Sequence, residues 1–190
     1  MKVEQYVMAY GVEQDRLRAL LPDGFTSLRP VLRINAEIRD GLTGYIELNT
    51  AVERNGTRGW LNISQFENVR FAYDGMSVKF STDNLRITFT RTGISGSCPA
   101  EKDNEGCFFV SEDIRIRKPE VILSNKEFCD CSFGWTFSET SARGESIGKT
   151  LPAYPTEAVK VYPRMELTAE NAAEIPCRQV LGAYTVSFER

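Results

Sequence analysis

Two neighbouring segments, 31–38 and 45–53, carry polar side chains of the kinds that bind ligands or move protons. They fall at every second position: Arg33, Asn35, Glu37, Tyr45, Glu47 and Asn49. Strand side chains alternate between two faces, so two paired strands would present these residues on one common face. A carboxylate, an arginine and amides together suit a small polar ligand or acid–base chemistry. If the sheet closes, that face is the lumen of a barrel; otherwise it is the wet side of a one-sided sheet, which the pattern favours.

The chain of 190 residues contains no histidine. Ser-His-Asp and Cys-His catalysis, imidazole metal sites and histidine proton shuttles are therefore excluded. A general acid or base must be Asp, Glu, Lys, Tyr or Cys. Glu47 is the first candidate catalytic residue, because it sits among polar neighbours on the predicted common face.

Lys118 is the second candidate catalytic residue. It follows Arg115 and Arg117, and a lysine beside another cation gives up its proton more readily and then acts as a Schiff-base nucleophile. Alternation places the two arginines on one strand face and Lys118 on the other. The pattern favours the plainer interpretation, a lysine that ends a strand before the turn at Pro119.

Five cysteines occur, at positions 98, 107, 129, 131 and 177. The odd number argues against a disulfide framework. Cys129 and Cys131 share a strand face and, with Cys98 and Cys107, would offer four thiolates to zinc, but the spacing differs from paired Cys-x2-Cys knuckles. Buried core thiols are the favoured interpretation, and we expect neither a metal nor a cofactor.

The elements that would position these residues are mostly strands. Helical periodicity is confined to 13–21 and 168–174, with Thr168 as N-cap of the second. Asn55-Gly56 and Asp74-Gly75 are hairpin signals. The predicted strands are 31–38, 45–53, 58–66, 68–73, 76–81, 85–90, 107–123, 128–138, 157–166 and 180–189, with loops at 93–106 and 141–156. Because so many strands need edge protection, residues 1–190 are predicted to form a single mainly β domain, an antiparallel barrel or strongly curved sheet.

Composition narrows the range of partners. The net charge is −3, hydrophobic residues make up 42% and charged residues 26% of the chain, which is ordinary for a globular protein. Nothing predicts binding to nucleic acid or to a membrane, and the N-terminus lacks a signal-type apolar stretch, so we expect a cytoplasmic protein. A small molecule is the expected partner, and self-association is left open.

The order of these features resembles the start of the acetoacetate decarboxylase family. The resemblance rests on the opening strand Tyr6–Tyr10, the helix 13–21 ending in Leu20-Leu21-Pro22, Pro30-Val-Leu-Arg33, Gly44-Tyr45-Ile-Glu47, the Asn55-Gly56 hairpin before Gly59-Trp60, and Leu85–Thr90. It covers about the first third of the chain and fades beyond residue 90. The resemblance implies the family's β fold and a small keto acid as the class of substrate.

The departures from the family pattern concern its chemistry. In the family, a Gly-Arg-Glu-Leu segment and a Pro-Lys-Lys segment with the Schiff-base lysine follow the aromatic strand, whereas this chain has no lysine between Trp60 and Lys79. Val3 stands near the position of a family arginine, and Asn35 replaces an acidic residue. Of the active-site set that the resemblance implies, Glu47 alone is kept.

Three functions remain open at this point. The first is a divergent acetoacetate decarboxylase-like protein without the lysine, which binds a small organic ligand in a barrel cavity near Glu47, through Arg33, Asn35 and Tyr45. The second is a carbon–carbon lyase, a decarboxylase for a small keto acid with Lys118 or Lys79 as a relocated nucleophile. The third is a structural or self-associating β domain with a solvated polar face.

Overall fold

The computed structural model describes residues 1–96, 107–110, 115–117, 126–137, 143–145 and 160–190. The two helices are α1 (Gln14–Leu20) and α2 (Ala169–Ala173). The strands are β1 (Lys2–Gly11), β2 (Thr26–Arg39), β3 (Thr43–Arg54), β4 (Thr57–Asp74), β5 (Ser77–Ser81), β6 (Leu85–Gly96), β7 (Cys107–Val110), β8 (Arg115–Arg117), β9 (Lys126–Trp135), β10 (Arg143–Glu145) and β11 (Gln179–Glu189).

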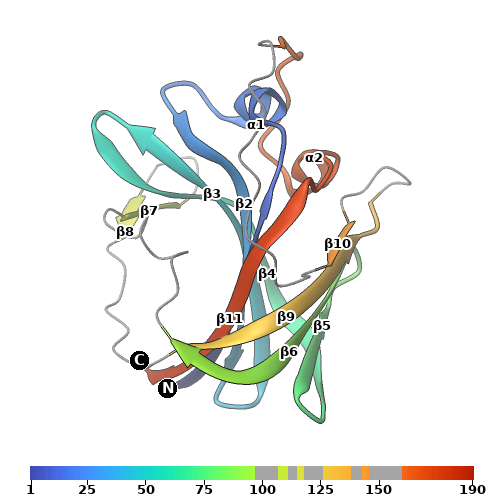
Figure 1. Cartoon of the computed structure of the whole chain (residues 1–190). Coiled ribbons are helices and arrows are strands. Elements are labelled where there is room, and N and C mark those ends of the chain that lie inside the picture. The colour runs from blue at the N-terminus through green and yellow to red at the C-terminus, as the bar shows by residue number, and fades with distance from the viewer. Residues whose placement is uncertain (97–106, 111–114, 118–125, 138–142, 146–159) are drawn as a thin grey trace.

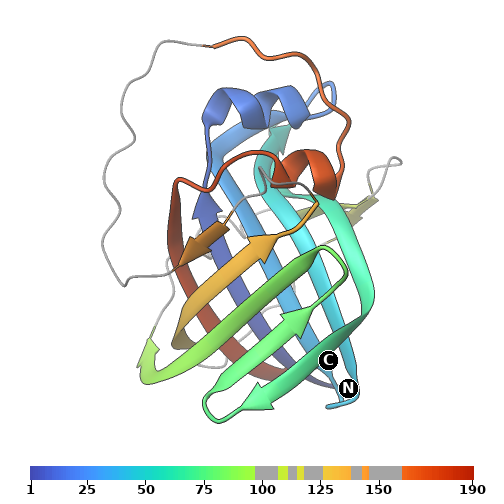
Figure 2. The ribbon, with the colours of Figure 1, turned by 90° about the vertical axis from the view of Figure 1, so that its right-hand side faces the viewer.

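The strands form a sheet that closes into a ring (Figures 1 and 2). The path β3-β2-β1-β11-β9-β6-β5-β4 returns to β3 through the β3–β4 pairing. Closure depends on the long strand β4, whose first part pairs with β3 and whose last part, from Arg70 to Asp74, pairs with β5. Near the end of the first part, just before Val69 pairs with Gly44, Asn68 has a positive φ of 54°, a conformation that asparagine tolerates better than most residues. The ring pairs both edges of each strand in the path, which removes the hazard of open sheet edges.

The sheet is mixed rather than purely antiparallel. Strand β7 pairs in parallel with β4, matching Trp60 with Phe108, and β8 pairs with β7. Strand β10 lies off the ring path and pairs with β9. The other described pairings are antiparallel, as predicted.

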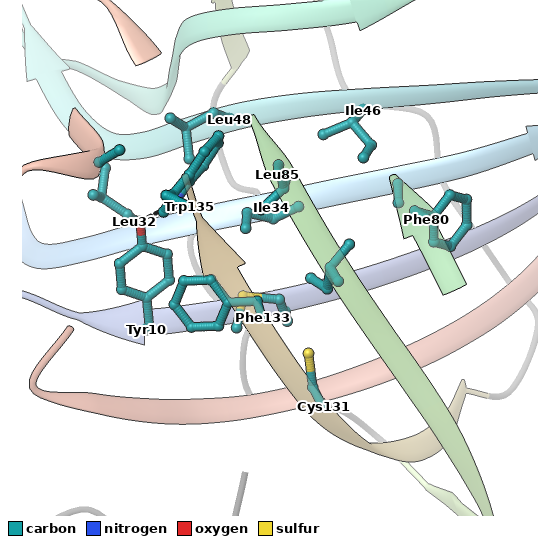
Figure 3. Packing of buried hydrophobic residues seen from close by; sticks show 14 of the residues in the cluster. Tyr10, Leu32, Ile34, Ile46, Leu48, Phe80, Leu85, Cys131, Phe133 and Trp135 are labelled. Carbon is teal, nitrogen blue, oxygen red and sulfur yellow. Dashed lines mark hydrogen bonds between the residues drawn. The ribbon is translucent and has the colours of Figure 1, made fainter. Parts of the chain in front are cut away.

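The interior of the ring is filled by one apolar face from each strand of the path (Figure 3). Leu32 and Ile34 of β2 meet Phe133 and Trp135 of β9 there, and all four are buried. Tyr10, which is fully buried, accepts a hydrogen bond from Trp135 Nε1 at 3.2 Å, so the polar ends of both aromatic side chains are paired. The interior is therefore a packed core stabilised mainly by burial of aliphatic and aromatic side chains.

Both helices lie at one end of the ring (Figures 1 and 2). Leu17 and Leu20 of α1 are fully buried in the core, and Thr168 caps α2 by accepting a hydrogen bond from the Asn171 backbone N–H at 3.1 Å. The segment before α2 is tied to α1, because the Met165 N–H donates to the Ala19 carbonyl oxygen at 2.9 Å. Within the described residues, neither helix has the length or apolar character needed to cross a membrane.

Most predicted elements are confirmed, with shifted ends. The mainly β class, both helices and both hairpins are present, and Asn55 and Gly56 have the positive φ values, 50° and 77°, of a two-residue hairpin turn. The strands predicted at 58–66 and 68–73 form one strand, β4. The loop predicted at 93–106 was too long, since β6 runs to Gly96, and the loop predicted at 141–156 contains strand β10. In the predicted 107–123 strand, the structure has β7 and β8 in the described parts.

The strand predicted at 157–166 is wrong for its described residues, 160–166, which form no strand. This segment is held by side chains instead of a ladder of backbone hydrogen bonds. The Tyr162 hydroxyl donates to Glu13 at 2.6 Å, and the Arg164 guanidinium donates to Asp23 at 3.0 Å and to the Leu21 carbonyl at 3.1 Å. Every second side chain of this segment thus contacts α1 or the residues beside it. The resulting alternation in the sequence is the same as that of a strand.

Candidate functional site

The polar residues of β2 and β3 do come together on one face of the sheet. The register pairs Arg33 with Asn49 and Asn35 with Glu47, so these four form a square of two cross-strand pairs. Because the neighbouring apolar residues of both strands fill the ring interior, the square lies on the opposite, outer face. Arg33 is 4%, Asn35 5% and Asn49 0% exposed. These four residues and Asn62 of β4, which pairs with Asn49, are together called the polar cluster.

This placement differs from both interpretations of the sequence pattern. The polar cluster is not inside the ring, because Leu32, Ile34 and Leu48 occupy that side. It is not a solvated outer face either, because three of the four residues of the square are buried and Glu47 is half-buried. Alternation reports which residues share a face, but not what covers that face.

Glu47 is held by its neighbour two positions earlier on the same strand. The Tyr45 hydroxyl donates to Glu47 Oε1 at 2.5 Å, and Gln65 Oε1 lies 3.4 Å from the same hydroxyl. Burial, followed by the charge of Glu47, raises the pKa of Tyr45 well above its usual range, so the phenol stays a donor. The Arg39 guanidinium stacks on the Tyr45 ring at 3.9 Å from its centre. Tyr45 therefore orients Glu47 rather than exchanging protons.

Glu37, on the same face, has a structural role. Its carboxylate accepts hydrogen bonds from Arg39 Nε at 2.9 Å, Gln5 Nε2 at 3.3 Å and Arg190 at 3.3 Å, and the residue is 2% exposed. A buried carboxylate with this many donors is satisfied by the protein. Glu37 links Arg190 to β2. Glu47 is therefore the carboxylate that lies next to the buried amides.

Arg33 lies against aromatic rings. Its guanidinium carbon is 4.1 Å from the centre of the Trp60 ring and 5.7 Å from that of Phe108. The guanidinium carbon of Arg29 lies 5.7 Å from the centre of the same Trp60 ring. Cation–π contacts of this kind are strongest where water is excluded, as at buried Trp60.

Three asparagines of the polar cluster have buried amide atoms without a hydrogen-bond partner. These atoms are Asn35 Oδ1, Asn49 Oδ1, Asn49 Nδ2 and Asn62 Oδ1. Asn49 pairs with Asn62 across β3 and β4, so the amides lie on one side of the sheet. A buried amide left unpaired costs about 1–3 kcal/mol, and native proteins rarely retain several together.

Asn62 and Trp60 were not among the residues predicted for the site. The signal that finds them is the two-residue hairpin turn at Asn55-Gly56. Counting outward from the Arg54–Thr57 pair brings Asn62 opposite Asn49 and Trp60 opposite Ala51, as the structure has them.

The described part of the structure places no candidate nucleophilic lysine next to Glu47. Lys118 lies outside the described residues. Lys79 is exposed on β5 and pairs with Asp74 at 2.6 Å. Lys126, unpredicted, is buried on β9 with its amine 5.6 Å from the centre of the Tyr184 ring. Strands β11, β1 and β2 separate β9 from β3, which amounts to about 19 Å along the sheet at the usual strand spacing.

The described cysteines of β9 belong to the core. Cys129 and Cys131 are buried in the ring interior, and burial raises the pKa of both thiols, to about 12 for Cys129. Cys98 lies outside the described residues. In the part of the chain that the structure describes, no group of three or more Cys, Asp or Glu side chains is arranged to hold a metal ion.

Two surface hollows in the described structure lie away from Glu47. One is lined by residues of β4 and the β5–β6 turn, including Arg70 and Asp83. The other lies on β6, β9 and β10 and includes Arg86 and Arg143. Neither is lined by a residue of the polar cluster.

Comparison with known proteins gives a match at the level of structure. No family model matches the sequence, and no curated protein does. The crystal structure of acetoacetate decarboxylase from Legionella pneumophila superposes with a TM-score of 0.56 at 13% identity, covering 98% of this chain and 81% of that one. A second acetoacetate decarboxylase structure gives 0.54 at 11% identity, covering 98% and 84%. Despite its distant sequence, the chain has the acetoacetate decarboxylase-like fold.

Proposed function

We propose that this chain is a divergent acetoacetate decarboxylase-like protein that binds a small organic ligand at the polar cluster and lacks Schiff-base chemistry. The observation that carries the proposal is the amide of Asn49, which is fully buried and has no hydrogen-bond partner at either atom. A folded protein gains nothing by burying such a group, whereas a ligand that pairs with it recovers the lost hydrogen bonds.

Glu47 supplies the polar chemistry of the proposed site. It is half-buried, paired in register with Asn35, and oriented by the Tyr45 hydroxyl. A carboxylate in this position accepts a hydrogen bond from a ligand or takes up a proton. It offers no electron sink, which an amine provides when it forms an imine with a keto acid. Ligand binding, rather than decarboxylation, is therefore the proposed activity.

The lyase alternative requires an amine close to Glu47. Lys79 is engaged by Asp74 and Lys126 lies four strand spacings away, so neither favours it. Lys118 is the remaining candidate for the Schiff-base nucleophile, and chemical trapping tests it directly. The third function, a domain with a solvated polar face, finds no support in the burial of Arg33 and Asn35.

The test of binding is a ligand screen by protein-observed NMR and thermal shift, with small keto acids, hydroxy acids and amides. Glu47→Gln and Asn49→Leu should weaken any hit at least about tenfold, because each removes a hydrogen bond to the ligand. Glu53→Gln, on the same strand beyond the polar cluster, is the matched control and should bind as the parent does. A hit that all three variants bind equally would overturn the proposed location, and a screen without hits would overturn the proposal.

The test of mechanism is borohydride reduction in the presence of acetoacetate or pyruvate, followed by intact-mass measurement. We expect no adduct. A covalent adduct, mapped to Lys118 or any other lysine, would replace the binding proposal with the lyase.

A further inference from the structure

The unpaired amide atoms of the asparagines in the polar cluster differ in chemical type. Asn35 Oδ1, Asn49 Oδ1 and Asn62 Oδ1 are acceptors, and Asn49 Nδ2 is a donor. An amide oxygen accepts a hydrogen bond only from a group that carries hydrogen on nitrogen or oxygen. Among these asparagine atoms, the unpaired acceptors thus outnumber the unpaired donor.

These atoms lie within reach of one small molecule. Asn49 is central, because it pairs with Arg33 on one side and with Asn62 on the other, and it lies diagonal to Asn35. Directly paired residues have Cβ atoms about 4.5–5.5 Å apart, and diagonal neighbours are about 7–8 Å apart. A head group of a few atoms above Asn49 would therefore contact two or three of the amides.

The charges around the cluster do not favour a bare carboxylate at Asn49. An ionised carboxylate carries acceptors alone, so it could accept from Asn49 Nδ2 but would leave the three asparagine oxygens unpaired. The carboxylate of Glu47 is on the same square, which adds repulsion between like charges. The Arg33 guanidinium packs against Trp60, with its carbon 4.1 Å from the ring centre.

We infer that the ligand presents a neutral head group with both donors and an acceptor, of which a primary carboxamide is the simplest. This inference rests on the proposed function and names its ligand class. The two N–H groups of a carboxamide pair with asparagine oxygens, and its carbonyl accepts from Asn49 Nδ2. The site would thereby separate an amide from the acid of the same shape.

The test uses near-isosteric pairs: acetoacetamide against acetoacetate, and lactamide against lactate. Affinities are measured by protein-observed NMR titration at pH 7. We expect each amide to bind at least about tenfold more tightly than its acid, because the acid leaves an asparagine oxygen unpaired. Asn49→Leu, of similar volume, should abolish this preference, whereas Asn84→Leu, on the turn between β5 and β6, should keep it.

The possible results separate this inference from the proposed function. Tighter binding of the acids, weakened by Asn49→Leu, would overturn the inference and leave the proposed site standing. Absence of binding by both members of each pair, with a crystal structure showing only a buried water on Asn49, would overturn both. Circular dichroism and the melting temperature establish that each variant is folded. A loss of binding is then attributed to the substituted site and not to unfolding.

Discussion

The Tyr45 hydroxyl donates a hydrogen bond to Glu47 Oε1 at 2.5 Å from two positions earlier on β3. Both side chains lie on the outer face, where Tyr45 is buried and Glu47 half-buried. This hydrogen bond makes the orientation of the Glu47 carboxylate depend on Tyr45, which need not contact a ligand itself. Its consequences can be measured in the absence of any ligand.

Tyr45→Phe should lower the free energy of unfolding at pH 8 by about 1–2 kcal/mol, through loss of a hydrogen bond to a carboxylate. Burial and then Glu47 raise the pKa of Tyr45 in the folded state, so its contribution is full below the unfolded pKa near 10 and is lost as pH rises above it. The parent should thus lose up to ~1.4 kcal/mol per pH unit more than Tyr45→Phe above pH 10. Urea unfolding at pH 8, 10 and 11 measures the stability difference and its pH dependence. If the free energy of unfolding fell equally with pH in the parent and in Tyr45→Phe, the raised pKa of Tyr45 would be contradicted.

Asn49→Leu should stabilise the unliganded protein by about 1–2 kcal/mol, because an apolar side chain of similar size replaces an unpaired buried amide. The same change should weaken ligand binding. Denaturant unfolding of the variant and of Asn84→Leu measures the first effect. Destabilisation by Asn49→Leu would mean that the amide is already satisfied in the folded protein.

Tyr10→Phe should cost about 1–3 kcal/mol of stability, because it leaves Trp135 Nε1 without its acceptor in the ring interior. Trp135→Phe removes the donor as well as volume, and the double variant should lose less than the sum of the single changes. Thermal and denaturant unfolding provide the double-mutant cycle. Additive losses would show that the hydrogen bond contributes nothing.

Gly44→Ala should disrupt the closure of the ring. A Cβ at Gly44 would lie 2.2 Å from the backbone oxygen of Val69, at the irregularity in the β3–β4 register. The backbone must move to admit it, so we expect a loss of several kcal/mol or failure to fold. Gly134→Ala is the matched control, since its Cβ would meet nothing nearer than 3.8 Å. Equal melting temperatures for the two variants would contradict the close packing at Gly44.

The thiols of Cys129 and Cys131 should stay unmodified in the folded protein at pH 8. Both are buried and their pKa values are raised by burial, so little thiolate is present or accessible. Brief labelling with iodoacetamide, followed by peptide mass mapping, should find them modified only in urea. Rapid native labelling of either residue would contradict their core position.

The local elements and the partition of β2 and β3 into two faces can be predicted from the sequence alone. Turn chemistry at Asn55-Gly56 and alternation from Leu32 to Asn49 act over a few residues, so a single sequence carries them. The same signals identify Arg33, Asn35, Tyr45 and Glu47 as one group. The register of the hairpin also contains the position of Asn62, although alternation within each segment does not reveal it.

Which face fills the ring, and which residues become buried on the other side, depends on how distant strands pack together. Closure joins β3 to β4 and places β9 opposite β2, contacts between segments far apart in the chain that no local pattern encodes. For the same reason, the segment after residue 160 resembles a strand in sequence and instead follows α1. Whether Glu47 lies in a lumen, in water or beside buried amides depends on packing between distant elements, which is a property of the whole fold.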